Sequence, residues 1–115
     1  MKLADIITAL DLTVLSCPDV ATRDVCGGYA GDLLSDVMAH SHAGQLWITR
    51  QTHRNVIAVA ALKEHSGVIL AQAARPDPEM LAKAAQENIL VAVSPQPAFE
   101  TAGLLYRLLA SATAG

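Results

Sequence analysis

Aromatic side chains are scarce in this 115-residue chain, which has one Trp, one Phe and two Tyr. Apolar residues nevertheless make up 52% of it, so the core must be built from Ala, Val, Leu and Ile. Small apolar side chains let helices pack closely but leave little buried area per residue. A chain of this length suits one domain that folds without a metal or a disulfide. We expect a single domain over residues 1–115, which would gain stability by burial against a second copy.

Positive charge is also in short supply. The net charge is −3 at pH 7, whereas nucleic-acid-binding domains usually carry a strongly basic surface. No apolar run reaches the ~20 residues needed to cross a membrane. The N-terminal segment lacks the clean apolar stretch and the small-residue cleavage site of a secretory signal. These absences predict a cytoplasmic protein with neither a nucleic-acid nor a membrane partner.

Residues with obvious catalytic or metal chemistry are few and scattered. Cys17 and Cys26 do not form a CxxC pair, and without an export signal we expect both thiols to be reduced and inert. The histidines form neither an HExxH motif nor a Cys/His cluster, and no serine occupies a GxSxG motif. We expect no metal, no cofactor and no catalytic residue, so the protein is predicted not to be an enzyme.

Short β-rich segments alternate with helical ones along the chain, as in α/β folds. Strands are expected at residues 12–16, around 25–26, and at 46–49, 67–70 and 89–93, and helices at 3–10, from 31 or 32 to 40, at 56–62, at 78–87 and after 97. Residues 56–62 could form either, but the flanking strands suit a parallel crossover, which is usually helical. The expected fold is a three-layer α/β/α sandwich with a mostly parallel sheet.

Three of the helices carry further local signals. The helix at 78–87 has Asp77 as its expected N-cap, Pro78 at its first position and Asn88 at its end. The helix ending at residue 40 has an expected apolar face of Leu33, Leu34, Val37 and Met38. The last helix has an expected apolar stripe of Phe99, Ala102, Leu105, Tyr106 and Leu109.

A polar and basic segment, residues 49–55, lies between the strand at 46–49 and the helix at 56–62. Ligands of open parallel sheets bind beyond the carboxyl ends of the strands. With Thr52 as the expected N-cap, Arg50, His53 and Arg54 stand at the positive end of the helix dipole, a conflict that an anion would relieve. The anion could be a ligand phosphate or a carboxylate of the same or a neighbouring chain. The simpler alternative is an exposed turn with solvated arginines.

Glycines spaced GGxxG precede the helix that ends at residue 40. The segment DVCGGYAGD (24–32) matches neither GxGxxG nor a P-loop, and Asp32 would repel a phosphate. We interpret it as a tight structural turn, because glycine chiefly supplies backbone freedom. If the segment at 49–55 does bind an anion, Gly28 or Gly31 is expected to assist. The candidate ligand-binding residues are Thr49, Arg50, Gln51, Thr52, His53, Arg54, Asn55 and Gly28.

The helix at 56–62, VIAVAAL, has no polar face over nearly two turns. A helix that is apolar all round is buried on more than one side, whereas an outer helix of so small a domain should have a solvated face. We therefore expect it to lie in a subunit interface, most simply that of a two-fold dimer. Long side chains from another element could cover it instead. The candidate interface residues are Val56, Ile57, Val59 and Ala60.

Three sequence blocks resemble the DRTGG domain family: GYAGDLLSDVMA (28–39), GQLWITRQTHRNVIAVAAL (44–62) and SPQPAFETAGLLYRL (94–108). The opening LADIITALDLTVLS is similar to the family's usual start. The resemblance implies a fold like the N-terminal domain of HPr kinase/phosphorylase. Such domains accompany CBS-domain pairs and some phosphate acetyltransferases, which implies a regulatory or ligand-sensing role. Free-standing members occur near iron-only hydrogenase and sensor-kinase genes, which implies a partner protein from such a system.

The chain departs from the family where a TGG-like turn usually follows the central strand. It has Gln72, Ala73, Ala74 and Arg75 there, and residues other than glycine enter the φ > 0 region less readily, so we expect no close ligand approach at this loop. Without a P-loop, kinase activity is not expected. Two functions remain: a non-enzymatic regulatory module acting through homo-oligomerisation and protein contact, and a sensor of an anionic ligand such as a nucleotide.

Overall fold

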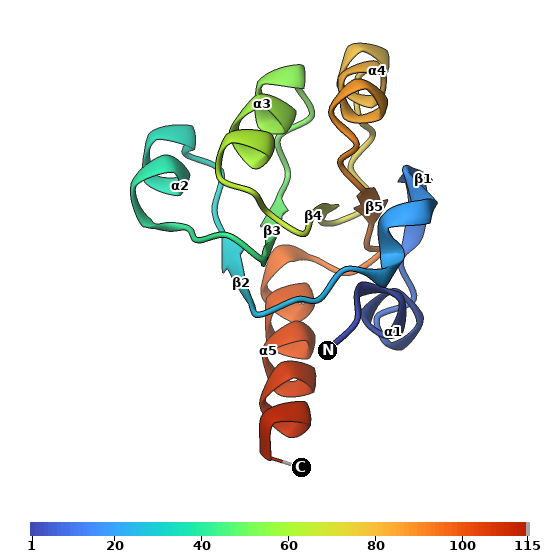
Figure 1. Cartoon of the computed structure of the whole chain (residues 1–115), viewed down its shortest axis with the longest axis vertical. Coiled ribbons are helices and arrows are strands. Elements are labelled where there is room, and N and C mark those ends of the chain that lie inside the picture. The colour runs from blue at the N-terminus through green and yellow to red at the C-terminus, as the bar shows by residue number, and fades with distance from the viewer. Residues whose placement is uncertain (115) are drawn as a thin grey trace.

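A computed structural model describes residues 1–114, with side chains up to residue 112; Gly115, the last residue of the expected domain, lies outside the described part. Its elements are α1 (Leu3–Ala9), β1 (Thr13–Ser16), η1 (Pro18–Thr22), β2 (Gly27–Ala30), α2 (Leu34–His40), β3 (Gln45–Thr49), α3 (Arg54–Leu62), β4 (Gly67–Leu70), α4 (Pro78–Glu87), β5 (Val91–Val93) and α5 (Ala98–Ala114). Helices cover both faces of one sheet (Figure 1). The expected three-layer α/β fold is confirmed.

The sheet has five strands in the order β1-β5-β4-β3-β2. The strands β2, β3, β4 and β5 are parallel neighbours, and β1 joins β5 in the antiparallel sense. In register, Trp47 of β3 pairs with Tyr29 of β2 and Val68 of β4. β1 and β2 therefore form the two edges of the sheet, and the site described below depends on the β2 edge.

Each face of the sheet carries its own core, because alternate residues of a strand point to opposite faces. Trp47, Val68 and Leu70 pack against α2, α3 and α4, which form one layer above the sheet in Figure 1. Leu46, Ile48 and Ile69 belong to the opposite core, with α1 and α5. Trp47 is fully buried and its Nε1–H donates to the main-chain oxygen of Gly31 at 2.8 Å. Burial on both faces explains why β4 and the middle of β3, residues 46–48, are continuously apolar.

Local sequence signals set the ends of α4, whereas tertiary strand pairing decides the structure of the glycine-rich segment. α4 begins at Pro78 directly after Asp77, and Asn88 ends it in the left-handed region with φ 58°, as predicted. The segment expected to be a tight turn instead forms β2, two residues later than the short strand expected around residues 25–26. Pairing with β3 supplies main-chain hydrogen bonds that outweigh the low strand propensity of glycine.

α2 starts later and buries less than its sequence predicts. It begins at Leu34, and of its expected apolar face only Val37 is fully buried, while Leu33 is 68% exposed. The helix lies at the end of its layer beside α3 (Figure 1). A helix in that place has a neighbour on one side only, so part of its apolar face stays in solvent.

Two residues of the loop after β4 have positive φ, although the loop contains no glycine. Gln72 and Ala73 have φ of 56° and 52°, both in the left-handed region. Their N–H groups donate to the main-chain oxygens of Gln96 at 2.7 Å and Ser94 at 2.8 Å. Two tertiary hydrogen bonds thus hold a backbone shape that glycine would take without strain. None of the helices within residues 1–114 is long and apolar enough to cross a membrane.

Candidate functional site

Asp32 ties together the strand-end segment at residues 49–55. The buried hydroxyl of Thr49, at the end of β3, donates to Asp32 Oδ1 at 2.6 Å. The N–H of Arg50 donates to the same oxygen at 2.8 Å. The amide Nε2 of Gln51 donates to the main-chain oxygen of Asp32 at 2.9 Å. A carboxylate from the loop after β2 therefore occupies the end of β3.

A second carboxylate lies at the start of α3. His53 Nδ1 lies 3.4 Å from Asp77 Oδ2, and the N–H of Asp77 donates to the main-chain oxygen of Thr52 at 3.1 Å. The prediction that Thr52 caps α3 is wrong: His53 is the N-cap residue, and it makes no side-chain capping bond. Asp32 and Asp77 supply negative charge where an anion was expected. Carboxylates of the same chain therefore supply the negative charge near the start of α3, which is one of the alternatives that the sequence left open.

Three arginines at this end keep their charged groups in solvent. Arg50 and Arg54 belong to the predicted segment, and Arg75 lies on the loop that the Asp77–Thr52 bond holds beside it. Within the described part of the chain, none of their guanidinium groups forms an ion pair or a hydrogen bond. Asn55 is exposed in the first turn of α3. An external anion would have these guanidinium groups to bind.

Gly28 does not belong to the segment at 49–55. It lies in β2 and faces α5, where a Cβ would stand 2.9 Å from Leu105 Cδ2. Thr49 points to the opposite face of the sheet, as Trp47 does two residues before it. The absence of a side chain at Gly28 lets α5 approach the sheet closely.

The candidate interface residues of α3 are mostly inside the chain. Val56, Ile57 and Ala60 have exposed fractions of 1%, 0% and 0%, and Val59 is half-buried. α3 lies between α2 and α4 in its layer (Figure 1), so neighbours cover both of its flanks. The assignment of Val56, Ile57 and Ala60 to a subunit interface is therefore wrong. Only a narrow strip remains outside, including Ala58 and Leu62.

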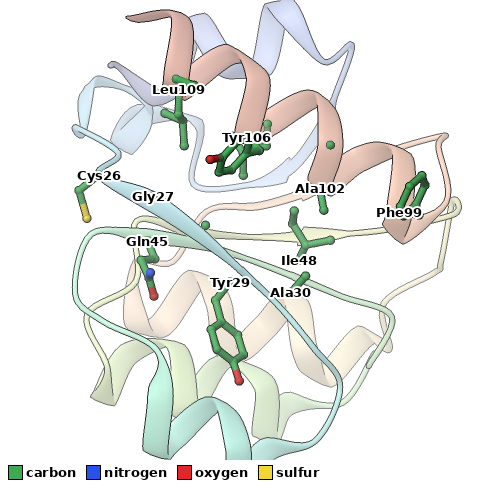
Figure 2. A pocket seen from close by; sticks show the side chains of 14 residues that line it. Cys26, Gly27, Tyr29, Ala30, Gln45, Ile48, Phe99, Ala102, Tyr106 and Leu109 are labelled. Carbon is green, nitrogen blue, oxygen red and sulfur yellow. The ribbon is translucent and has the colours of Figure 1, made fainter. Parts of the chain in front are cut away.

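A groove of about 870 Å³ runs between the edge strand β2 and α5 (Figure 2). Small residues line both walls of this space, such as Ala30 of β2 and Ala102 of α5. Its lining contains no Asp, Glu, Lys or Arg. Phe99 and Tyr106 stand over it, 85% and 78% exposed. The expected apolar stripe of α5 is thus divided, because Leu105 is buried whereas these two rings are in solvent.

Cys26 and Gln45 supply polar atoms at one end of the groove. The Cys26 thiol is exposed and donates to the main-chain oxygen of Ala43 at 3.2 Å. Cys17 is also free, so the two cysteines form no disulfide. The groove was not identified from the sequence, since neither the edge position of β2 nor the outward direction of the two rings has a local signal.

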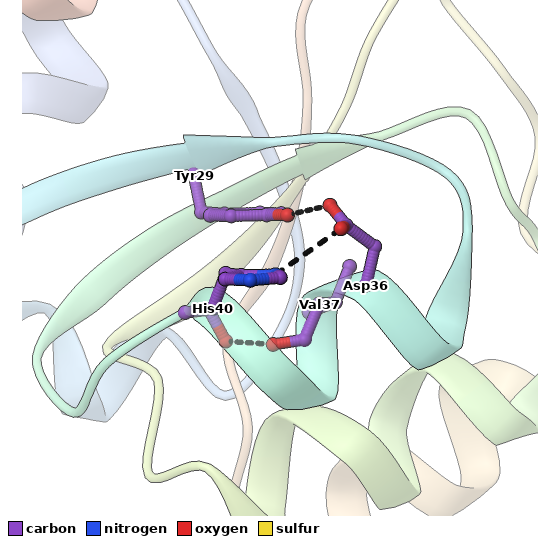
Figure 3. Close-up of polar contacts among 5 residues, drawn as sticks. Tyr29, Asp36, Val37 and His40 are labelled. Carbon is purple, nitrogen blue, oxygen red and sulfur yellow. Dashed lines mark hydrogen bonds and ion pairs between the residues drawn. The ribbon is translucent and has the colours of Figure 1, made fainter.

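Asp36 accepts hydrogen bonds from two rings on the other side of β2 (Figure 3). The hydroxyl of Tyr29 donates to the Asp36 carboxylate, and His40 Nδ1 lies 3.1 Å from Asp36 Oδ1. The bond from Tyr29 lowers the pKa of Asp36 and raises the pKa of Tyr29. The i, i+4 spacing of Asp36 and His40 is visible in the sequence, but the approach of Tyr29 depends on β2. The cluster fastens α2 to the edge strand.

Ser41 and His65 form a buried pair beneath α2 and α3. The Ser41 hydroxyl donates to the Val37 oxygen at 2.6 Å and lies 2.8 Å from His65 Nε2. A hydroxyl has one proton, so His65 Nε2–H is the donor to Ser41 and Nδ1 is left as an acceptor. That Nδ1 has no partner within the described residues. Burial, with a smaller effect of Lys63, lowers the pKa of His65 to about 4.

The surroundings of Ser41 and His65 identify them as structural. Their exposed fractions are 1% and 2%, so no substrate reaches the hydroxyl. The imidazole also meets the Trp47 ring edge-on, with centroids 5.7 Å apart. A neutral imidazole at this place joins the end of α2 to the residues that follow α3.

No protein-family model and no curated protein sequence matches the chain. Its structure is similar to the crystal structure of the CBS and DRTGG domains of the regulatory region of Clostridium perfringens pyrophosphatase, complexed with the activator diadenosine tetraphosphate. The TM-score is 0.73 at 16% sequence identity, and the match covers 90% of this chain and 45% of that one. The chain therefore has a fold that occurs in a regulatory region, and it spans less than half of that structure.

Proposed function

We propose that this chain is a non-enzymatic regulatory module of the DRTGG type that acts through homo-oligomerisation and contact with other proteins. The groove between β2 and α5 carries this proposal. It contains no charged residue, and Phe99 and Tyr106 stand over it in solvent. Exposed aromatic side chains gathered on an uncharged surface are typical of protein interfaces. The regulatory setting of the similar pyrophosphatase region supports the same role.

The partner proposed from the family resemblance is a cytoplasmic sensor kinase or a component of a hydrogenase system. Isothermal titration of a purified partner of this kind into the chain tests the proposal. Phe99→Asp together with Tyr106→Asp should weaken binding by about tenfold or more, because charges would replace the apolar anchors. Leu62→Asp is the matched control, since Leu62 is 68% exposed on the opposite layer. Equal affinity of the wild type and the double variant would exclude this groove as the contact surface.

A second candidate function is a sensor of an anionic ligand such as a nucleotide at residues 49–55. The exposed guanidinium groups of Arg50 and Arg54 favour it, as does the nucleotide bound to the similar regulatory region. Asp32 and Asp77 lie beside them and would oppose a phosphate. Binding therefore requires the arginines to outweigh these carboxylates.

Thermal unfolding with adenine nucleotides, inorganic phosphate or acyl phosphates tests the sensor. A ligand at 100 times its dissociation constant should add roughly 2.7 kcal/mol to the free energy of unfolding, a rise of several degrees in the midpoint. Arg50→Ala with Arg54→Ala should remove the rise, and Arg23→Ala should leave it. If none of these compounds shifts the midpoint, the sensor proposal is withdrawn and the protein-contact proposal stands alone.

A further inference from the structure

We infer that the α5 side of the groove binds a second copy of this chain, with α5 packed antiparallel against α5 about a two-fold axis near Gly103. This inference rests on the proposed function, in which the same face is the contact surface. Three features of α5 lead to it: a glycine that the chain itself does not require, a pair of complementary charges, and two exposed rings.

The exposed face of α5 presents a row of residues spaced four, three and four apart. Phe99, Gly103, Tyr106 and Ala110 lie along this row, because residues three or four apart share a face of a helix. The two rings stand at either side of Gly103. One face thus presents projecting side chains and a recess between them. A symmetric contact needs both on the same surface.

Gly103 has no explanation within the chain. A Cβ at this position would meet no atom within 4 Å, and the residue lies in the interior of α5. Glycine there costs about 1 kcal/mol relative to Ala. Close approach of a second helix would explain the glycine, since glycine allows a closer backbone approach than a residue with a Cβ.

The charges beside this row are complementary under the same symmetry. Glu100 and Arg107 are exposed, and within the described residues neither side chain forms an ion pair or a hydrogen bond. They lie seven residues apart on one flank of the row, on either side of Gly103. An antiparallel two-fold contact centred there brings Glu100 of each copy opposite Arg107 of the other. The same axis brings Phe99 of each copy to within about one residue of Tyr106 of the other, so both pairings favour a second copy as the partner.

The two exposed rings supply a large part of the apolar area that such a contact needs. Phe99 and Tyr106 are 85% and 78% exposed. An aromatic side chain buries roughly 150–250 Å², so the rings of two copies supply on the order of 500–800 Å². A stable interface buries about 1,200–2,000 Å² in total. Leu104, which is 41% exposed, and the groove walls beside the rings add to this area.

Sedimentation equilibrium of the purified chain at micromolar concentration is the test. We expect a species of twice the 12.1 kDa chain mass. Glu100→Arg places an arginine opposite Arg107 at both symmetry-related positions of the dimer. The repulsion should weaken association by about tenfold or more. Adding Arg107→Glu to Glu100→Arg should restore it, because the exchanged charges again face opposite charges. Gly103→Glu should give a monomer whose circular dichroism is unchanged, and Leu62→Asp should remain dimeric.

Two results would overturn the inference. One is a wild-type chain that stays monomeric throughout the concentration range. The other is a dimer that Gly103→Glu and Glu100→Arg leave intact, which would place the contact on another surface. A monomer that still loses its partner protein on Phe99→Asp and Tyr106→Asp would refute the homodimer alone and leave the regulatory proposal standing.

Discussion

At the scale of single residues, His65 gives stability a dependence on pH. Its buried Nδ1 lacks a partner within the described residues, and its pKa is lowered from 6.5 to about 4. As the pH falls through 6.5 the unfolded chain binds a proton that the folded chain accepts only near pH 4. The unfolded state therefore binds more protons between these values, so the free energy of unfolding decreases as the solution is acidified.

The expected loss between pH 7 and pH 4 is on the order of 2–3 kcal/mol from this residue. Urea unfolding at both pH values measures it. His65→Phe keeps an aromatic ring but cannot titrate, so its stability should change less with pH than that of the wild type. His42→Gln, at an exposed position, is the control and should behave like the wild type. The same loss in His65→Phe as in the wild type would assign the pH dependence to other groups.

Tyr29 should control the acidity of Asp36. The hydrogen bond from the Tyr29 hydroxyl is the largest of the effects that lower the pKa of that carboxyl. Tyr29→Phe removes the donor and should raise the pKa of Asp36, which carbon-13 NMR of the side-chain carboxyl can follow. His40→Gln should also raise it, because the charge and the hydrogen bond of His40 both lower the pKa of Asp36. A pKa that is the same in Tyr29→Phe and the wild type would mean that the bond does not persist in solution.

At the scale of elements, the loop after β4 stores backbone strain. Ala73 has φ 52°, where a Cβ costs about 1–2 kcal/mol. Ala73→Gly should therefore raise the free energy of unfolding by about 1 kcal/mol, measurable by urea unfolding. Ala82→Gly is the matched control: in the middle of α4 the same substitution should lower stability by a similar amount. A loss of stability in both variants would argue that the loop is relaxed.

The contact between α5 and the sheet depends on Gly28. Gly28→Ala would place a Cβ 2.9 Å from the buried Leu105 side chain, so either α5 or Leu105 must move. We expect a loss of about 1–3 kcal/mol in the free energy of unfolding, seen as a lower thermal midpoint. Gly27→Ala is the control, because its Cβ would lie at an ordinary 3.7 Å from the Gln45 side chain. Equal midpoints for the two variants would show that α5 adjusts freely.

At the scale of the whole molecule, the proposed dimer would couple stability to protein concentration. A dimer that forms only from folded chains raises the thermal midpoint as the protein concentration increases. We expect this dependence in the wild type and a flat response in Gly103→Glu. Differential scanning fluorimetry across a concentration series measures both. A flat response in the wild type would indicate that folding needs no second copy.

The sequence by itself determined the order and type of most elements. Short, mainly apolar runs predicted β3 and β4, and Pro78 and Asn88 predicted the ends of α4. These signals are local, since a cap or a run of buried side chains acts within a few residues. The parallel sheet followed from the spacing of strands, and the polar segment at 49–55 was correctly placed at the carboxyl end of β3.

Only the tertiary structure decided which surfaces are free. α3 is apolar on its flanks because α2 and α4 cover them. Its apolar composition is therefore not evidence of a subunit interface. Asp32 reaches Thr49 through the pairing of β2 with β3, and Asp77 reaches His53 through contact between two loops. Phe99 and Tyr106 stay in solvent because the sheet ends at β2 and offers them no cover. Each outcome depends on elements distant in sequence, and local patterns do not encode such contacts.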